Sequence, residues 1–159
     1  MVAHRGMANH LCAKIRDLGL TAADAVAQTA SQCFDIAVWQ MLAALALGGR
    51  VHVYPDEVAH DPARLLDRLA ADGVTVLEIV PSLLRLMIDE VGQRGIDRPR
   101  LTALRWLIPT GEALPPDLCA RWLAMLPAAP LVNAYGPTES SADVPHFPVD
   151  RPLPPRTNW

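Results

Sequence analysis

The sequence has 159 residues, of which 51% are hydrophobic, so it is long enough and apolar enough to fold as one domain with a buried core. A net charge of -3 gives no electrostatic basis for binding nucleic acid. The apolar runs are short and interrupted, which argues against a membrane span, and the first residues lack a signal-peptide pattern.

The three cysteines, Cys12, Cys33 and Cys119, are odd in number and widely scattered. They match neither a disulfide framework nor a zinc-binding pattern. We therefore expect reduced, buried thiols in a cytoplasmic protein.

The first half of the chain predicts a helix, a strand, a second helix and a second strand. Apolar residues at helical spacing predict a helix over 7–18, and a short strand follows over 23–29. The clearest helix covers 35–47, where Asp35 is a good N-terminal cap and two glycines close the far end. The alternating residues 50–54 predict a strand.

The second half continues the alternation. It predicts helices over 62–70, 82–91 and 116–126, and strands over 74–80, 104–108 and 131–134. Strands that alternate with helices imply an α/β fold with a mostly parallel sheet. The proline-rich residues 145–159 predict an irregular connector.

The most informative motif is NAYGPTE at 133–139, which combines an aromatic ring, a tight Gly-Pro turn, a hydroxyl and a carboxylate. The ring of Tyr135 can stack on a nucleobase, Thr138 can donate to a phosphate, and Glu139 can hold Mg²⁺ through oxygen. A surface turn with a solvated Glu139 is the alternative interpretation.

Three further segments accompany this motif: FDIAVW at 34–39, TGEAL at 110–114 and the first nine residues, MVAHRGMAN. Together the four ordered segments resemble the amino-acid adenylation domains of nonribosomal peptide synthetases, within the AMP-dependent synthetase/ligase (adenylate-forming) superfamily. The resemblance implies a partial adenylation domain over 1–148, from the large N-terminal subdomain of that fold, and a truncated proline-rich connector over 149–159.

The resemblance implies a ligase that uses ATP and Mg²⁺ to convert an α-amino acid into aminoacyl-AMP and pyrophosphate. The acyl group then passes to the phosphopantetheine thiol of a carrier protein, a step of secondary metabolite biosynthesis. It implies a nucleotide site made of Gly111, Glu112, Asn133, Tyr135 and Thr138, with Glu139 holding Mg²⁺. Gly111 would let the backbone approach the adenine closely.

The resemblance also implies an amino-acid site made of Asp35, Ile36, Trp39, Glu78, Ile108, Thr110, Ala134, Ala142 and Asp143. Asp35 would pair with the α-amino group of the substrate, a strong and oriented contact in a partly dry pocket. The alternative is that Asp35 only caps a helix while Trp39 fills the core.

Glu78 interrupts an otherwise apolar strand. It lies either at an exposed strand end, where it costs nothing, or in the pocket, where a buried carboxylate needs a partner. Together with Asp143, a pocket acid leads to the hypothesis of a basic substrate resembling ornithine, lysine or arginine, in which case Glu78→Ala should abolish selectivity for basic amino acids.

The family's phosphate loop and catalytic lysine have no counterpart in the sequence, and Lys14, the only lysine, is expected on the surface. We therefore expect an internal fragment that does not adenylate by itself. Alternatives are a non-catalytic remnant or partner domain of a truncated synthetase and, less favoured because of Asp35, a fragment of an acyl- or aryl-CoA ligase.

Overall fold

The computed structural model describes residues 3–96, 99–134, 136 and 146–149, which form an α/β fold around one six-stranded sheet. The strand order is β2-β1-β3-β4-β5-β6. Neighbouring strands from β2 through β5 pair in parallel, and β6 pairs antiparallel with β5. The strands are β1 (Ala25–Gln28), β2 (Arg50–Val53), β3 (Val76–Ile79), β4 (Trp106–Pro109), β5 (Leu131–Ala134) and β6 (His146–Val149). The predicted mostly parallel sheet is confirmed.

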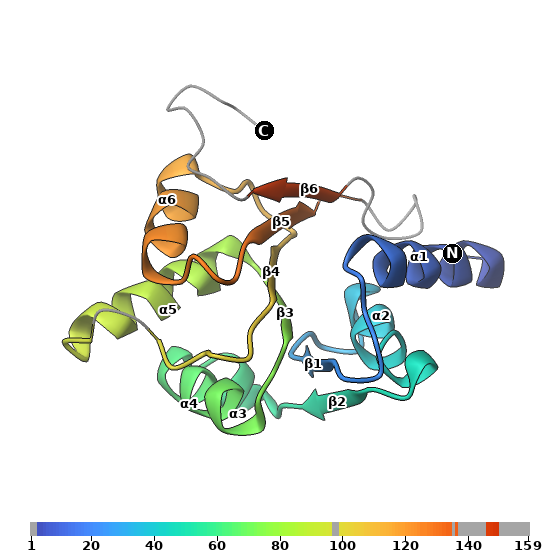
Figure 1. The fold of residues 1–159 in the computed structure, drawn as a ribbon, viewed down its shortest axis with the longest axis horizontal. Helices are drawn as coiled ribbons and strands as arrows, with labels where there is room; N and C mark the ends of the chain where they lie inside the picture. Colours follow the sequence, from blue (N-terminus) through green and yellow to red (C-terminus); the bar gives the residue numbers. More distant parts are fainter. Residues whose placement is uncertain (1–2, 97–98, 135, 137–145, 150–159) are drawn as a thin grey trace.

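Helices cover both faces of this sheet (Figure 1). One face carries α1 (His4–Asp17) and α2 (Ile36–Leu42). The other carries α3 (Asp56–Ala59), α4 (Pro62–Asp72), α5 (Pro81–Gln93) and α6 (Pro116–Met125). The strands β1, β2, β3 and β4 are therefore each followed by a helical crossover to the next parallel strand, which is the arrangement that parallel pairing requires.

Two apolar cores result, one on each face of the sheet. Successive side chains of a strand point to opposite faces. Val76 and Ile108 accordingly belong to the core beneath α1 and α2, whereas Leu77 and Leu107 belong to the larger core beneath the other helices. All four side chains are fully buried, which explains why the strands are apolar on both faces.

The helix predicted over 35–47 is shorter than expected. It ends at Leu42, and a 3₁₀ turn over Leu45–Leu47 follows. The chain turns tightly here because the Gly49 N–H donates to the Ala44 carbonyl at 2.8 Å. A Cβ at Gly49 would lie only 2.8 Å from the Asp24 carbonyl oxygen, so only glycine allows β2 to start this close to the residue that precedes β1.

The prediction of an irregular connector is wrong for His146–Val149, which form β6. Pro148 is tolerated because β6 has a described partner on one side only, and an edge strand can lack one N–H donor. The boundary expected between 148 and 149 therefore falls inside a strand. The short helix α3 was also not predicted.

The cysteine prediction holds only in part. Cys119 is buried in α6, and burial raises the pKa of its thiol to about 11. Cys12 and Cys33 are exposed, so the expectation of buried thiols is wrong for them. In the part of the chain that the structure describes, no helix has the length and apolar character needed to cross a bilayer.

A buried carboxylate ties the amino ends of three strands together. Asp24 precedes β1 and is 1% exposed. It accepts hydrogen bonds from the Arg105 guanidinium at 2.6 and 2.8 Å, the Thr75 hydroxyl at 2.8 Å and the Thr21 N–H at 2.8 Å. Thr75 and Arg105 lie just before β3 and β4. Burial alone would raise the pKa of Asp24, but these hydrogen bonds outweigh it and lower the pKa below its ordinary value.

We predict that Asp24→Asn lowers the free energy of unfolding at pH 7 by about 2–3 kcal/mol, because charge-assisted hydrogen bonds are lost inside the fold. The folded-state pKa lies below the unfolded-state value, so this stabilisation is complete above pH ~5 and disappears as the pH falls through the folded-state pKa. Urea unfolding measured between pH 7 and pH 3 should therefore show that the difference in free energy of unfolding between wild type and Asp24→Asn shrinks as the pH falls.

Glu57→Gln, on the exposed surface of α3, is the matched control and should change stability by less than about 0.5 kcal/mol. A gap between wild type and Asp24→Asn that stays constant down to pH 3 would contradict the role assigned to the Asp24 charge.

Candidate functional site

The sheet order places a topological switch at the carboxyl ends of β1 and β3. From β1 the chain crosses to β2 on one side, and from β2 it crosses back past β1 to β3 on the other. In open α/β sheets, ligands bind in the crevice outside the carboxyl ends of the strands at such a switch. The predicted amino-acid-site residues in the described part of the chain lie on the strands and segments at this edge, so the fold favours a site here.

The loop after β1 is held in place by the side chain of Gln40, which is fully buried. Its amide oxygen accepts from the backbone N–H groups of Thr29 at 3.2 Å and Ala30 at 3.0 Å. Its amide nitrogen donates to the Glu78 carbonyl at 3.2 Å, and the Thr29 hydroxyl donates to the same carbonyl, also at 3.2 Å. One side chain of α2 therefore joins the loop after β1 to the end of β3.

That loop leads directly to Asp35, the N-cap of α2. One Asp35 carboxylate oxygen accepts from the Ile36 N–H at 2.9 Å, so the capping interpretation is correct. The side chain is only partly buried, and a carboxylate can accept further hydrogen bonds. Capping is therefore compatible with a contact to a substrate amine, which stays a prediction.

Several predicted pocket residues form one apolar wall beneath α1 and α2. Trp39, Ile108 and Ala134 belong to the same buried cluster, and Ile36 packs against it. These residues come from α2, β4 and β5, which are separated in sequence. Trp39 is 1% exposed, and its indole N–H has no hydrogen-bond acceptor among the described residues. Trp39 therefore both fills the core, as the alternative interpretation held, and lies against the predicted site.

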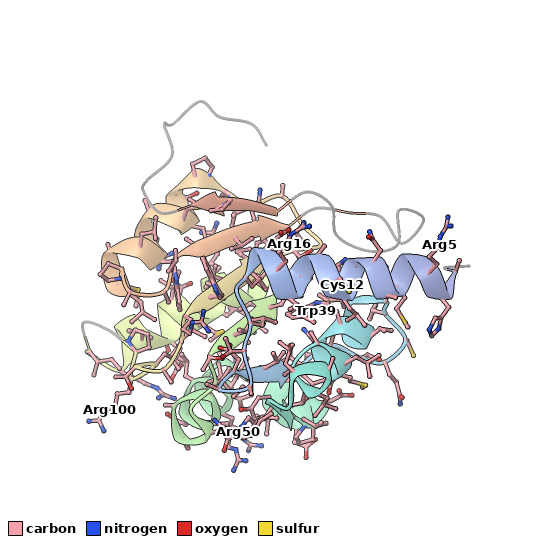
Figure 2. The ribbon with its side chains drawn as sticks, turned by 45° about the vertical axis from the view of Figure 1, so that its right-hand side comes forward. Arg5, Cys12, Arg16, Trp39, Arg50 and Arg100 are labelled. Atoms are coloured by element: carbon pink, nitrogen blue, oxygen red, sulfur yellow. The ribbon has the colours of Figure 1, made fainter. Side chains whose placement is uncertain are left out.

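The expectation that Lys14 is a surface residue is wrong. Its ammonium nitrogen lies 3.1 Å from a carboxylate oxygen of Glu78, and both side chains are 0% exposed. The same nitrogen lies 4.4 Å from the centroid of the Trp39 ring, a cation–π contact. Figure 2 shows Trp39 directly beneath α1, the helix that carries Lys14. Glu78, Lys14 and Trp39 thus form a buried cluster that contains two charged groups and includes two of the predicted pocket residues.

This cluster also corrects the interpretation of Glu78. The side chain is not at an exposed strand end, because Glu78 is 1% exposed within β3. The carboxylate already has a cation from the protein, so its need for a partner no longer argues for a basic substrate. The buried residues of α1 are His10 and Lys14, one turn apart, and the buried Leu18 follows directly after the helix, so this spacing puts Lys14 on the face that packs against the sheet.

Of the predicted nucleotide-site residues in the described part, Gly111 and Glu112 follow β4, and Asn133 lies on β5. Gly111 adopts a left-handed φ of +79°, which glycine accommodates without strain. The adjacent Glu112 carboxylate accepts from the Ser82 N–H at 2.9 Å and the Ser82 hydroxyl at 2.8 Å, and so caps the first turn of α5. Its side chain therefore anchors the loop whose backbone the resemblance assigns to the adenine site.

Two further predicted residues, Thr110 and Asn133, lie beside or on the central strands of the sheet. Thr110 follows β4 and is 5% exposed, and Asn133 on β5 is partly buried opposite Phe147 in the register. The remaining ones, Tyr135, Thr138, Glu139, Ala142 and Asp143, lie outside the described residues. No cluster of three or more metal-binding side chains occurs within the described ranges.

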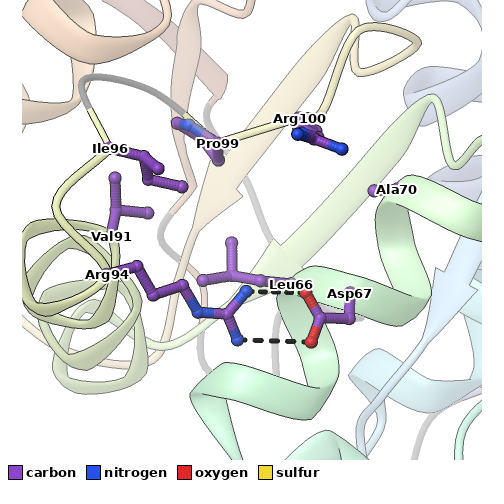
Figure 3. A pocket seen from close by; sticks show the side chains of 8 residues that line it. All are labelled: Leu66, Asp67, Ala70, Val91, Arg94, Ile96, Pro99 and Arg100. Carbon is purple, nitrogen blue, oxygen red and sulfur yellow. Dashed lines mark hydrogen bonds and ion pairs between the residues drawn. The ribbon is translucent and has the colours of Figure 1, made fainter.

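A cavity of about 400 Å³ lies elsewhere, beside α4 and α5 (Figure 3). Its lining residues are Leu66, Asp67, Ala70, Val91, Arg94, Ile96, Pro99 and Arg100. The Arg94 guanidinium spans it, donating to Asp67 at 2.6 Å and to Glu90 at 2.7 Å. These hydrogen bonds raise the pKa of Arg94 above its ordinary value. None of the described site residues lines this cavity.

A family model described as "AMP-binding enzyme" matches residues 1–158. Enterobactin synthase component F of Escherichia coli O157:H7 is 34% identical over 149 residues, covering 94% of this chain and 11% of that protein. Tyrocidine synthase 3 of Brevibacillus parabrevis is 32% identical over 151 residues, covering 95% of this chain and 2% of that protein. The chain therefore spans a small part of these relatives.

Two nonribosomal peptide synthetases are among the solved structures that resemble this chain. The crystal structure of the nonribosomal peptide synthetase FmoA3 superposes with a TM-score of 0.89 at 31% identity, covering 99% of this chain and 17% of that one. A four-domain nonribosomal peptide synthetase bound to AMP and glycine superposes with a TM-score of 0.82 at 28% identity, covering 93% of this chain and 11% of that one.

We predict that Gln40→Met lowers the free energy of unfolding by about 2–3 kcal/mol, because two partly buried N–H groups and one carbonyl lose a hydrogen-bond partner. Amide hydrogen exchange should accelerate at Thr29 and Ala30, the two donors to Gln40. Gln93→Met, at the exposed end of α5, is the matched control and should leave both measurements unchanged. Unaltered protection of Thr29 and Ala30 in Gln40→Met would contradict this role.

Proposed function

Because this chain belongs to the AMP-binding enzyme family, we propose that it forms the amino-acid and adenine side of an adenylation domain in a nonribosomal peptide synthetase. The proteins named above, two of which are nonribosomal peptide synthetases, support this assignment. Since the chain spans 11% of enterobactin synthase component F, the activity is proposed for a complete adenylation domain that contains this segment.

The observation that carries the proposal is the position of Asp35. The residue stands at the N-terminus of α2, next to the topological switch of the sheet, and lies beside an apolar wall that includes Trp39 and Ile36. A partly buried carboxylate at the rim of an apolar site suits a zwitterionic ligand, because it can pair with an ammonium group while the wall receives a side chain. α-Amino acids have this composition.

The proposed reaction joins the amino-acid carboxylate to the α-phosphorus of ATP. A carboxylate oxygen forms the new bond to phosphorus, and the bond from that phosphorus to the bridging oxygen breaks, which releases pyrophosphate. Catalysis of this kind depends mainly on positioning and on neutralising charge. In the described part of the chain, Asp35 would position the amine, and the backbone at Gly111 would approach the adenine.

Asn133 and the residues outside the described ranges complete the proposal. Tyr135 would stack on adenine, the Asn133 side chain would bond to the adenine edge, Thr138 would contact phosphate, and Glu139 would hold Mg²⁺. The aminoacyl group would then pass to the phosphopantetheine thiol of a carrier domain: sulfur attacks the acyl carbon, and AMP leaves. One of the superposed structures is a four-domain synthetase, which is the setting this step needs.

We predict that Asp35→Asn, in a complete adenylation domain containing this segment, lowers kcat/KM for the amino acid at least about 100-fold, because an asparagine cannot pair ionically with the amine. The KM for ATP should stay within a factor of two to three. Amino-acid-dependent exchange of pyrophosphate into ATP is the measurement. Asparagine caps helices as well as aspartate does, so the substitution retains the cap.

Asp61→Asn is the matched control. Asp61 caps α4 by accepting from the Ala63 and Arg64 N–H groups, both at 3.0 Å, and it follows β2 rather than β1. It should leave the exchange rate unchanged. Undiminished activity in Asp35→Asn would overturn the role of Asp35. A wild-type domain that activates carboxylic acids without an α-amine would instead identify an acyl- or aryl-CoA ligase.

A further inference from the structure

We infer that Gln40 is a positioning residue for the proposed reaction: it holds Asp35 where the carboxylate can meet the α-amino group of the substrate. The inference rests on the proposed function and deepens it, because it names what places the substrate-pairing group. Gln40 lies on α2 and is not among the residues that the family resemblance assigns to either site. Its side chain is fully buried and has no exposed surface for a ligand, so it acts through its neighbours.

Gln40 closes the segment of chain that carries Asp35. Its amide oxygen accepts from the N–H groups of Thr29 and Ala30, which lie eleven and ten residues earlier in the sequence. Between these contacts the chain turns over 31–34 and then enters α2 at Asp35. Both ends of the segment therefore meet at one amide group, and Asp35 lies between them.

The other end of the same amide fixes this closed segment to the sheet. The Gln40 amide nitrogen donates to the Glu78 carbonyl at 3.2 Å, at the carboxyl end of β3. The Thr29 hydroxyl donates to the same carbonyl, also at 3.2 Å. At the amino ends of these strands the connection is through the backbone instead, because the Thr75 N–H donates to the Ala25 carbonyl at 2.9 Å. Side chains thus help to join β1 and β3 at the topological switch, where the fold favours a ligand.

A primary amide suits this role because it carries an acceptor and donors on one rigid group. The acceptor sets the shape of the segment, and the donor sets where that segment lies relative to β3. The position of Asp35 at the edge of the sheet depends on both contacts. Since a displacement of about 1 Å in a positioned group can cost on the order of 100-fold in rate, losing the amide should impair the contact between Asp35 and the substrate amine.

The test is a double-mutant cycle in a complete adenylation domain containing this segment, with amino-acid-dependent exchange of pyrophosphate into ATP as the measurement. Gln40→Met should lower kcat/KM for the amino acid about tenfold, chiefly by raising KM, while the KM for ATP stays within a factor of two to three. In the Asp35→Asn background the same substitution should cost less than about twofold, because the group that Gln40 positions is already impaired.

Two further variants complete the experiment. Gln93→Met, at the exposed end of α5, is the matched control and should change neither KM. Gln40→Glu is the conservative variant: a carboxylate still accepts from the two N–H groups but cannot donate to the Glu78 carbonyl, so it should lose about threefold, less than Gln40→Met. Thermal unfolding of each variant shows which of them are folded.

A purely structural role of Gln40 predicts something different. Gln40→Met would then cost the same factor in the wild-type and Asp35→Asn backgrounds, and this result would overturn the inference. An unchanged kcat/KM in Gln40→Met would overturn it too, while leaving the proposed function intact. A wild-type domain that activates no amino acid would refute both together. If Gln40→Met does not fold, Gln40→Glu enters the same cycle, and an equal loss in both backgrounds is sufficient to reject the inference.

Discussion

The candidate site depends on how Glu78 is held at the end of β3. Its backbone carbonyl accepts from Gln40 and Thr29, which join α2 and the loop after β1 to the middle of the sheet. Its side chain pairs with Lys14, which fastens α1 to the same face. One residue therefore links two helices and a loop at the topological switch, where a parallel sheet offers room for a ligand.

Much of the fold could be predicted from local sequence patterns. The strand Leu131–Ala134 was predicted to the residue, because its apolar run is bounded by clear breaks. The failures have non-local causes. After Leu42 the predicted helix gives way to a 3₁₀ turn that brings Gly49 close to the residue preceding β1, and β6 forms in a proline-rich stretch because β5 offers it an edge. No local pattern contains either contact.

The same difference between local sequence patterns and non-local contacts applies to the candidate site. The motifs indicated Trp39, Ile108 and Ala134 as neighbours although they are far apart in sequence, and the structure brings them into one cluster. The motifs did not indicate that Lys14 is buried, because a lysine on a helix is ordinarily solvated. Its burial is explained by a carboxylate 64 residues away. Glu112, which the resemblance assigns to the nucleotide site through its backbone, also anchors its loop, because its carboxylate accepts from Ser82 in the first turn of α5.

A buried ion pair gives little stability beyond what well-packed apolar residues could supply, since both charges lose their hydration. What the charges add is a directional contact, because an ammonium and a carboxylate must meet in one geometry, whereas apolar side chains can pack in several. The cluster of Lys14, Glu78 and Trp39 therefore fixes how α1 and α2 lie against β3.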